Sequence, residues 1–403
     1  MITRRFLLQS AAAAAAYSAQ GFPVARAENA PGVTDTEIKI GQTMPDSGPA
    51  SAYGVIGRTE LAYFKMINDQ GGINGRKINL ISLDDAYSPP KTVEQVRRLV
   101  EQEKVAFLFS TLGTAPNSAI RQYCNDNKVP QLFVQSGAPM FADPERFPWT
   151  IPGIPNYQTE ARIYAKHILS TKPDAKIAVL YQNDDFGKGY LKGLRDVLGP
   201  DRAGMIVKEV SYETSEPTVD SQVVTLHGSG ADVFLIAATP KFAAQAIRKS
   251  NDVGWNAARY LSYVSASVAS VLKPAGLERS KGLISASYVI DVTDPQWKDM
   301  SDMVAWKAFT DKYMSATEFG DSFAASGFGY AATLAQVLRQ CGNDLSRENI
   351  MSQAANVKDF HAPLLWPGIT LNTSPTNFSP IRQLQLTAFN GEHWEPIGNV
   401  LSD

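Results

Sequence analysis

VAFLFSTLGTAPNSAIRQYCNDNKVPQLFVQSGAP, residues 105–139, contains two short apolar runs separated by a segment that can form a helix. The runs, residues 105–109 and 129–134, have the length and composition of strands buried on both faces of a sheet. A loop of small and polar residues follows each run. This strand–helix–strand order predicts a parallel α/β sheet, in which both loops lie at the carboxyl ends of their strands.

The two loops, residues 110–116 and 135–139, are candidates for one wall of a small-molecule site. Ligands of open α/β sheets bind at this edge, and free backbone N–H groups at a helix start hold anions. The loops are therefore suited to a carboxylate. Ordinary connections between strands and helices have the same composition, so both interpretations stay open from this stretch alone.

Apolar runs and amphipathic segments alternate on both sides of this stretch, which predicts two doubly wound sheets. Prolines cluster at residues 147–156, where we expect the chain to cross from one domain to the next. The pattern breaks at residues 285–295, and two long helices and a C-terminal hairpin around Asn390-Gly391 follow. The predicted strands are residues 38–43, 77–83, 105–109, 129–134, 176–181, 205–210, 233–237, 259–262, 383–389 and 393–397.

Residues 1–27 read as an export signal. Two arginines, Arg4 and Arg5, precede an alanine-rich segment, and Ala25-Arg26-Ala27 is an A-x-A cleavage site. The arginine pair points to the twin-arginine route, although ordinary secretory signals often carry such a pair too. The alanine-rich segment is too short and too weakly apolar for a membrane anchor. We therefore expect a soluble, exported protein of 376 residues, enough for two domains.

Charge and composition bear on nucleic-acid binding, on disulfide pairing and on metal binding. The formal net charge of the 403 residues is −2, and removal of residues 1–27 makes it −5. This balance argues against nucleic acid, whose recognition calls for a basic patch. The two cysteines, Cys124 and Cys341, could pair in an exported protein or remain as two buried thiols. The spacing of a metal site is absent, and we expect no metal and no cofactor.

Three fragments resemble catalytic motifs but lack the required context. Gly320-Asp321-Ser322 opens a late helix rather than following the first strand, so Ser322 is better read as a helix cap. Ser88 and Lys91 have the S-x-x-K spacing, but the two prolines between them oppose the helical turn that this motif needs. The glycines of residues 187–193 miss the dinucleotide-binding spacing by one residue. We expect no enzyme.

Several motifs in order along the chain give it a family resemblance. They span nearly all of the mature chain, behind the export signal. They are Ser47-Gly48-Pro49 with Tyr53-Gly54, Asn68 with Gly71-Gly72-Ile73-Asn74-Gly75, Asp84-Asp85, Gly113-Thr114-Ala115 and Asp185-Phe186-Gly187-Lys188-Gly189. With them the chain resembles the type I periplasmic substrate-binding proteins of ABC importers, in the branch that binds leucine, isoleucine and valine.

The resemblance implies two Rossmann-like lobes, joined by a three-strand hinge, that close over a ligand. Lobe one would hold residues 28–153 and 290–378, and lobe two residues 154–289 and 379–403. The family works with an inner-membrane ABC permease and cytoplasmic ATPases, and the same fold also serves as a receptor that presents its ligand to a sensor. The resemblance thus implies a monomeric periplasmic protein.

The family's ligand contacts carry over to named positions. In the family, lobe one holds the ligand carboxylate with amides and hydroxyls of two loops. Here these loops match Thr114-Ala115 and Gln135-Ser136-Gly137. The resemblance also places Tyr53 against the body of the ligand and Phe186 on the closing lobe. A desolvated carboxylate needs several donors at once, which fits these loops.

The departures from the family suggest the ligand. Amino-acid binders carry an acid that pairs with the ligand ammonium, and the matching position here is Ser265. The family's lobe-one disulfide is missing too, because Tyr87 and Leu112 stand near its positions. With Tyr181 and Tyr263 as further aromatic neighbours, we expect an aromatic acid such as a benzoate or a phenylpropenoate. Aliphatic acids, amino acids and neutral ligands remain as alternatives.

Overall fold

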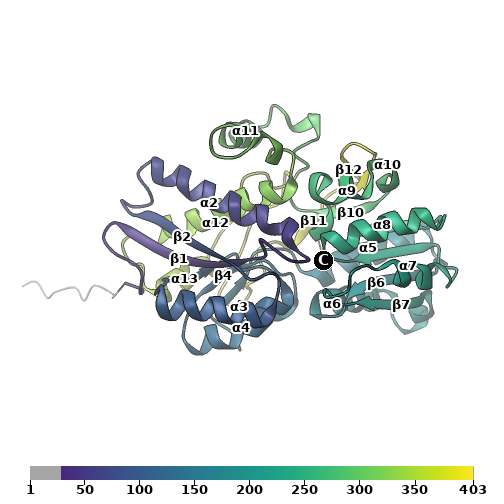
Figure 1. The fold of residues 1–403 in the computed structure, drawn as a ribbon, viewed down its shortest axis with the longest axis horizontal. Coiled ribbons are helices and arrows are strands. Elements are labelled where there is room, and N and C mark those ends of the chain that lie inside the picture. The colour runs from purple at the N-terminus through teal and green to yellow at the C-terminus, as the bar shows by residue number, and fades with distance from the viewer. Residues whose placement is uncertain (1–28, 403) are drawn as a thin grey trace, which may run out of the picture.

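The computed structural model describes residues 29–402 as an α/β protein with two sheets, which lie side by side in Figure 1. The expected export signal therefore lies outside the described residues. Within the described part of the chain, no helix has the length and apolar character needed to cross a membrane. The predicted fold class, two doubly wound lobes, is confirmed.

The first sheet has the strand order β2-β1-β3-β4-β5, and all its neighbours are parallel. Apolar side chains bury β3 and β4 on both faces, as residues 105–134 predict. The strand β3 is shorter than expected, although the preceding residues still hydrogen-bond to β1 through Ala106 and Phe107. The strands are β1 (Glu37–Met44), β2 (Lys77–Asp84), β3 (Leu108–Phe109), β4 (Gln131–Val134) and β5 (Thr150–Pro152).

The second sheet has the order β12-β11-β10-β9-β8-β6-β7, with β13 paired to β11. It is parallel from β10 to β7, and β11 and β12 form the predicted antiparallel hairpin, in which Phe389 faces Trp394. The break in the pattern at residue 285 hid β10, which was not predicted. The strands are β6 (Ile177–Gln182), β7 (Ile206–Tyr212), β8 (Val233–Ala237), β9 (Ala258–Leu261), β10 (Ile284–Ser287), β11 (Gln383–Phe389), β12 (Trp394–Pro396) and β13 (Leu401–Ser402).

Helices cover both faces of the first sheet. Figure 1 shows α2 and α12 on one face and α3 and α4 on the other. Asp321 caps α12 by accepting a hydrogen bond from the Phe323 backbone N–H. The expectation that Ser322 is the cap was therefore wrong by one residue, because the carboxylate before it reaches the free N–H groups. The helices of this part are α2 (Gly54–Asp69), α3 (Pro89–Arg97), α4 (Thr114–Asp126), α11 (Ser301–Tyr313), α12 (Ser322–Cys341) and α13 (Arg347–Ala354).

In the second part of the molecule, α5 packs on α6 and α7 packs on α8. Asp184 caps α6 by accepting from the N–H groups of Phe186 and Gly187. Both cysteines lie on helices of the first part: Cys124 and Cys341 are buried free thiols. The helices are α5 (Tyr157–Thr171), α6 (Asp185–Leu198), α7 (Asp220–His227), α8 (Pro240–Asp252), α9 (Lys273–Ala275) and α10 (Leu277–Ser280).

The chain passes between the two sheets three times. It leaves the first sheet after β5, returns after β10 to form α11, α12 and α13, and comes back to the second sheet at β11. The lobe boundaries predicted at residues 153, 289 and 378 follow this path and stay a prediction. Because the crossing segments run between the lobes, their side chains can reach a site that lies there.

Candidate functional site

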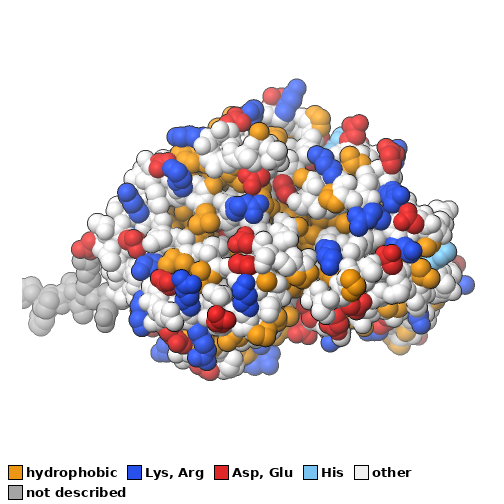
Figure 2. Space-filling model, in the orientation of Figure 1, with side chains coloured by type: hydrophobic (Ala, Val, Ile, Leu, Met, Phe, Trp, Pro, Cys, Tyr) orange, Lys and Arg blue, Asp and Glu red, His pale blue; other side chains and the backbone are white. Residues whose placement is uncertain are grey.

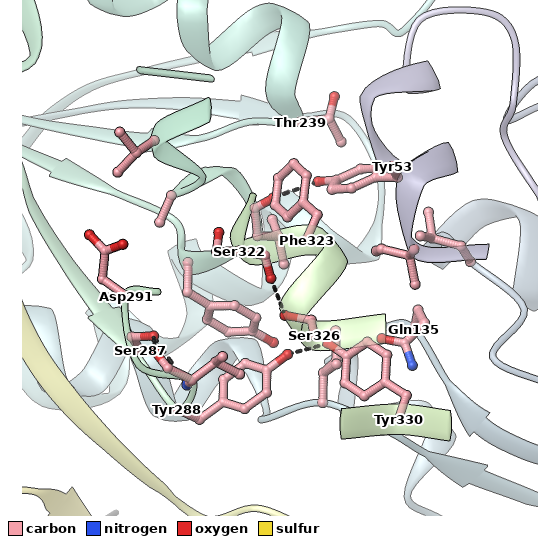
Figure 3. Close-up of a pocket in the computed structure, with 18 of the residues that line it drawn as sticks. Tyr53, Gln135, Thr239, Ser287, Tyr288, Asp291, Ser322, Phe323, Ser326 and Tyr330 are labelled. Carbon is pink, nitrogen blue, oxygen red and sulfur yellow. Dashed lines mark hydrogen bonds between the residues drawn. The ribbon is translucent and has the colours of Figure 1, made fainter. Parts of the chain in front are cut away.

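A cavity lies between the two parts of the molecule, where the carboxyl ends of strands from both sheets meet the crossing segments (Figure 3). It encloses about 990 Å³, including the part open to solvent. Ten of the 26 residues that line it are aromatic, and such rings are typical of pockets for small organic molecules. The aromatic lining residues are Tyr53, Tyr87, Tyr157, Phe186, Tyr263, Tyr288, Phe323, Tyr330, Trp366 and Trp394.

Four of the ten predicted site residues line this cavity: Tyr53, Gln135, Phe186 and Tyr263. Tyr53 is the last residue of a short turn that leads into α2. Its ring packs on Phe323, with the ring centroids 5.1 Å apart. The sequence thus brings together side chains from both lobes. Their contact with a ligand remains a prediction.

The four predicted donors of the carboxylate loops, Thr114, Ala115, Ser136 and Gly137, are not among the residues that line the cavity. The hydroxyls of Thr114 and Ser136 lie 2.6 Å apart and bond to each other. Tyr157, at the start of α5, covers them. Its backbone N–H donates to the Gly137 carbonyl at 3.0 Å, and a methyl group added at Gly137 would come within 3.0 Å of its ring.

The hydroxyl of Tyr157 therefore points at the donors that the resemblance assigned to the ligand. Burial raises the pKa of Tyr157 to about 12, and hydrogen bonding with the Gly137 N–H and with the hydroxyl pair of Ser136 and Thr114 acts in the opposite direction. A tyrosine hydroxyl that accepts such bonds still has its own proton to donate. No motif marked Tyr157, which directly follows the proline cluster of residues 147–156.

The other two predicted residues lie outside the cavity for different reasons. Ser265 is buried, and its hydroxyl donates to the Ala238 carbonyl at 2.6 Å. Tyr181 lies on β6 next to Gln182, whose side chain extends toward Tyr87 and Tyr212. Side chains alternate along a strand, so Tyr181 faces away from them. It does not line the cavity.

The residues that sequence reasoning missed come largely from the crossing segments and α12. Tyr288 follows β10 at the second crossing, and its hydroxyl bonds to that of Tyr330 on α12, as Figure 3 shows. Tyr87 and Leu112, which the resemblance places near the positions of the family's disulfide, also line the cavity. The alternation of apolar runs and amphipathic segments breaks near residue 288. This break was the available signal for Tyr288, because it marks a segment that crosses between the lobes.

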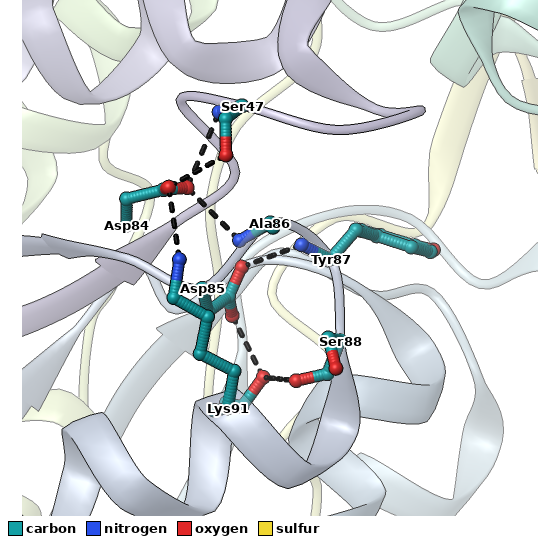
Figure 4. A network of polar contacts seen from close by, with 8 residues as sticks. Ser47, Asp84, Asp85, Ala86, Tyr87, Ser88 and Lys91 are labelled. Carbon is teal, nitrogen blue, oxygen red and sulfur yellow. Dashed lines mark hydrogen bonds and ion pairs between the residues drawn. The ribbon is translucent and has the colours of Figure 1, made fainter.

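Two carboxylates at the end of β2 hold the loop that carries Tyr87 (Figure 4). Asp84 accepts from the backbone N–H groups of Ser47 and Ala86, from the Ser47 hydroxyl at 2.6 Å and from Lys91 at 3.0 Å. These bonds hold its pKa well below the usual range. Asp85 accepts from the Tyr87 N–H at 2.9 Å. The Asp84-Asp85 motif thus ties the loop before Tyr53 to the loop of Tyr87.

A buried acid fixes the opposite wall. Glu160 on α5 accepts from the Tyr263 N–H at 2.8 Å, and the hydroxyls of Tyr164 and Tyr190 also bond to it. Burial raises the pKa of Glu160 to about 8. Tyr263 in turn donates to the Pro155 carbonyl at 2.7 Å and meets Tyr288 edge to face. Glu160 therefore positions Tyr263 without itself lining the cavity.

The charges of the lining are few. Among the described residues that line the cavity, there is no lysine, arginine or histidine, and Asp291 is the single acid. Asp291 is 7% exposed and accepts from the N–H and hydroxyl of Thr293 and from the Trp394 N–H. The indole N–H of Trp366 is buried and has no hydrogen-bond partner in the described part of the chain. The cavity thus offers one carboxylate and neutral donors.

Positive and negative side chains are interspersed over the face in Figure 2. Within residues 29–402, no group of three or more histidine, cysteine or acidic side chains is placed to hold a metal ion. The cavity between the lobes is therefore the candidate site.

Comparisons with known proteins agree with this architecture. An amino acid binding protein of Pseudomonas aeruginosa is 26% identical over 249 residues, which cover 56% of this chain and 60% of that relative. The match thus spans less than two thirds of the relative. A branched chain amino acid ABC transporter protein from Thermus thermophilus with bound valine superimposes with a TM-score of 0.82 at 14% identity, over 92% of this chain and 98% of that one.

A solute-binding protein of an ABC transporter from R. palustris, solved in complex with benzoate, gives a TM-score of 0.76 at 19% identity and covers 91% and 98% of the two chains. Both structural likenesses concern the fold. The profile of the periplasmic binding protein family matches residues 37–392, which is most of the chain. The family expected from the motifs is confirmed: this chain belongs to the periplasmic binding proteins.

Proposed function

We propose that the protein binds a small aromatic carboxylic acid, of the benzoate or phenylpropenoate type, between its lobes and delivers it to an ABC importer. The observation that carries this proposal is the lining of the cavity, ten aromatic residues without a cation. Aromatic rings favour edge-to-face and offset contacts with an aromatic ligand. The R. palustris relative of the same fold holds benzoate, which supports the same class.

The ligand carboxylate would lie against the hydroxyl of Tyr157. The Gly137 N–H and the hydroxyls of Ser136 and Thr114 lie within hydrogen-bonding reach of the Tyr157 hydroxyl. Thr114 is the first residue of α4. A chain of hydrogen bonds polarises its last donor, and the helix N-terminus favours negative charge. The predicted carboxylate loops would thus act on the ligand through Tyr157. The Trp366 N–H, which has no partner in the described residues, is a further donor for a ligand oxygen.

The protein would carry its ligand unchanged to an inner-membrane permease with cytoplasmic ATPases. Closure would bring Phe186 and Tyr263 across a ligand held by the first lobe, and the ligand would favour the closed state by its higher affinity for it. A receptor that presents its ligand to a sensor would use the same cycle. Capture of a permease subunit, as against a sensor kinase, by the ligand-bound protein distinguishes the two.

A second candidate is an amino-acid ligand, and Asp291 is the observation that favours it. No acid stands at position 265, but Asp291 lines the cavity and could pair with an α-ammonium. The Pseudomonas relative is described as an amino acid binding protein. Against this candidate, the carboxylate of Asp291 already accepts three hydrogen bonds.

Calorimetric titration of the purified protein with benzoate, cinnamate, leucine and valine tests the proposal. We expect binding of the aromatic acids, and a ligand that binds only the native state also raises the melting temperature. The Asp291→Asn variant separates the candidates, because it removes the partner of an ammonium and keeps the shape of the side chain. Tight binding of leucine that is lost in this variant, with no binding of benzoate, would reject the aromatic acid.

A further inference from the structure

A second, smaller cavity adjoins the first, with about 370 Å³ of empty space including the part open to solvent. Four residues line both cavities and so form the partition between them: Tyr288, Val289, Ser326 and Tyr330. The hydroxyls of Tyr288 and Tyr330 bond to each other across this partition, and Figure 3 shows them facing each other. The partition is thus closed by buried side chains that one hydrogen bond joins, and a ligand group that passes it must separate the two hydroxyls.

Small residues on α12 create the space. Ala325, Gly329 and Thr333 follow one another at intervals of four, and so they lie on one face of the helix. The segment from Ala362 to Leu371 forms the opposite wall. A larger residue at position 325 or 333 would extend into the cavity, whereas a Cβ added at Gly329 would lie 3.1 Å from the Pro363 carbonyl oxygen.

Each side-chain hydroxyl among the described residues that line the second cavity already has a hydrogen-bond partner. The Thr333 hydroxyl donates to the Gly329 carbonyl at 2.8 Å, and the Ser326 hydroxyl donates to the Ser322 carbonyl at 2.8 Å. Tyr288 and Tyr330 bond to each other. A buried water needs two to four polar partners, whereas apolar cavities stay dry and bind apolar guests.

We propose that this second cavity is a subsite for an apolar substituent of the ligand, which enters between Tyr288 and Tyr330. The inference rests on the proposed function, since the ring and carboxylate of the ligand would occupy the first cavity. It adds that the preferred ligands are aromatic acids with an alkyl or aryl substituent rather than benzoate itself. The substituent should be uncharged and free of hydrogen-bonding groups, because the hydroxyls of the described wall already have partners.

Titration of the whole protein with benzoate and with its 3- and 4-n-alkyl derivatives, from methyl to pentyl, tests this inference. Burial of each methylene should tighten binding about three- to fourfold in at least one series. The gain should stop when the cavity is full. Variants Ala325→Val and Ala362→Val, which fill it from opposite walls, should abolish the gain and leave the affinity for benzoate within about twofold.

Ala335→Val on the same helix is the matched control, because Ala335 is buried but lines neither cavity. It should keep the gain with chain length. If one filling variant fails to fold, the other and the wild-type series still decide. If benzoate binds but the affinity of the alkyl derivatives falls or stays constant from methyl to pentyl in both series, the subsite is overturned and the proposed function stays intact. Failure of benzoate and every derivative to bind overturns both.

Discussion

The hydroxyl of Tyr53 donates a hydrogen bond to the backbone carbonyl of Val264 at 2.8 Å, across the cavity between the lobes. Tyr53 belongs to the loop that leads into α2, and Val264 belongs to the turn that follows β9. Tyr53, whose motif predicts a contact with the ligand, thus also joins the two lobes. Its hydroxyl and its ring have separate roles, and two substitutions separate them.

Tyr53→Phe removes the hydrogen bond to Val264 and keeps the ring. We expect a weakening of ligand binding by about two- to tenfold, the net worth of one hydrogen bond. Tyr53→Ala also removes the contact with Phe323 and should weaken binding further. Calorimetry measures both, and the thermal unfolding of the ligand-free variants is the control. Wild-type affinity in both variants would remove Tyr53 from the site.

Ser270 makes a second contact between the lobes. Its hydroxyl donates to Asp321 at 2.5 Å, while Asp321 also caps α12 and accepts from Ser267 at 2.8 Å. Ser270→Ala keeps the cap and loses one interlobe bond, so it should weaken binding severalfold with little effect on the unfolding of the first lobe. Asp321→Ala loses the cap as well and should lower the free energy of unfolding by about 1 kcal/mol.

Titration calorimetry and denaturant unfolding of the two variants, side by side, check this division. The Ser270 result is decisive. If Ser270→Ala binds ligand as tightly as the wild type, the contact with Asp321 does not stabilise the closed state. If it lowers stability as much as Asp321→Ala does, the serine supports the fold rather than closure.

Stability should depend on the protonation of Glu160. Its pKa is raised by burial to about 8 from 4.5, so the folded protein holds a proton that the unfolded chain releases. The stabilisation is complete below about pH 4.5, falls as the pH rises toward 8 and changes no further above it. Burial favours the neutral acid, and the hydrogen bonds from Tyr164, Tyr190 and the Tyr263 N–H offset only part of this effect.

Glu160→Gln mimics the protonated acid and should remove this part of the pH dependence, at most about 1.4 kcal/mol per pH unit. Glu60 is a second buried acid with a pKa of about 8, and it should keep its own contribution in the variant. Denaturant unfolding between pH 5 and 9 measures the difference. Equal slopes for the variant and the wild type would show that Glu160 is ionised in the folded protein.

The sequence predicts the fold well because local signals determine it. The alternation of apolar runs and capped helices places the central strands, and Asn390-Gly391 places the hairpin. It predicts the site less completely. Tyr53 and Phe186 stand in motifs, whereas Tyr288 and Tyr330 meet only because the chain returns from β10 to α12. Ser265 stands at the expected position, but its hydroxyl is used by the Ala238 carbonyl.

Tyr157 is the sharpest test of how the ligand is held. Tyr157→Phe keeps the ring against Gly137 and removes the hydroxyl that we place between the carboxylate and the donors behind it. The affinity for benzoate should fall at least tenfold, since hydrogen bonds to a charged group are the strong ones. The affinity for benzamide, a neutral analogue, should fall less. Tyr181→Phe is the matched control, because Tyr181 lines no part of the cavity. Unchanged benzoate affinity in Tyr157→Phe would place the carboxylate elsewhere, with the Trp366 N–H as the next donor to test.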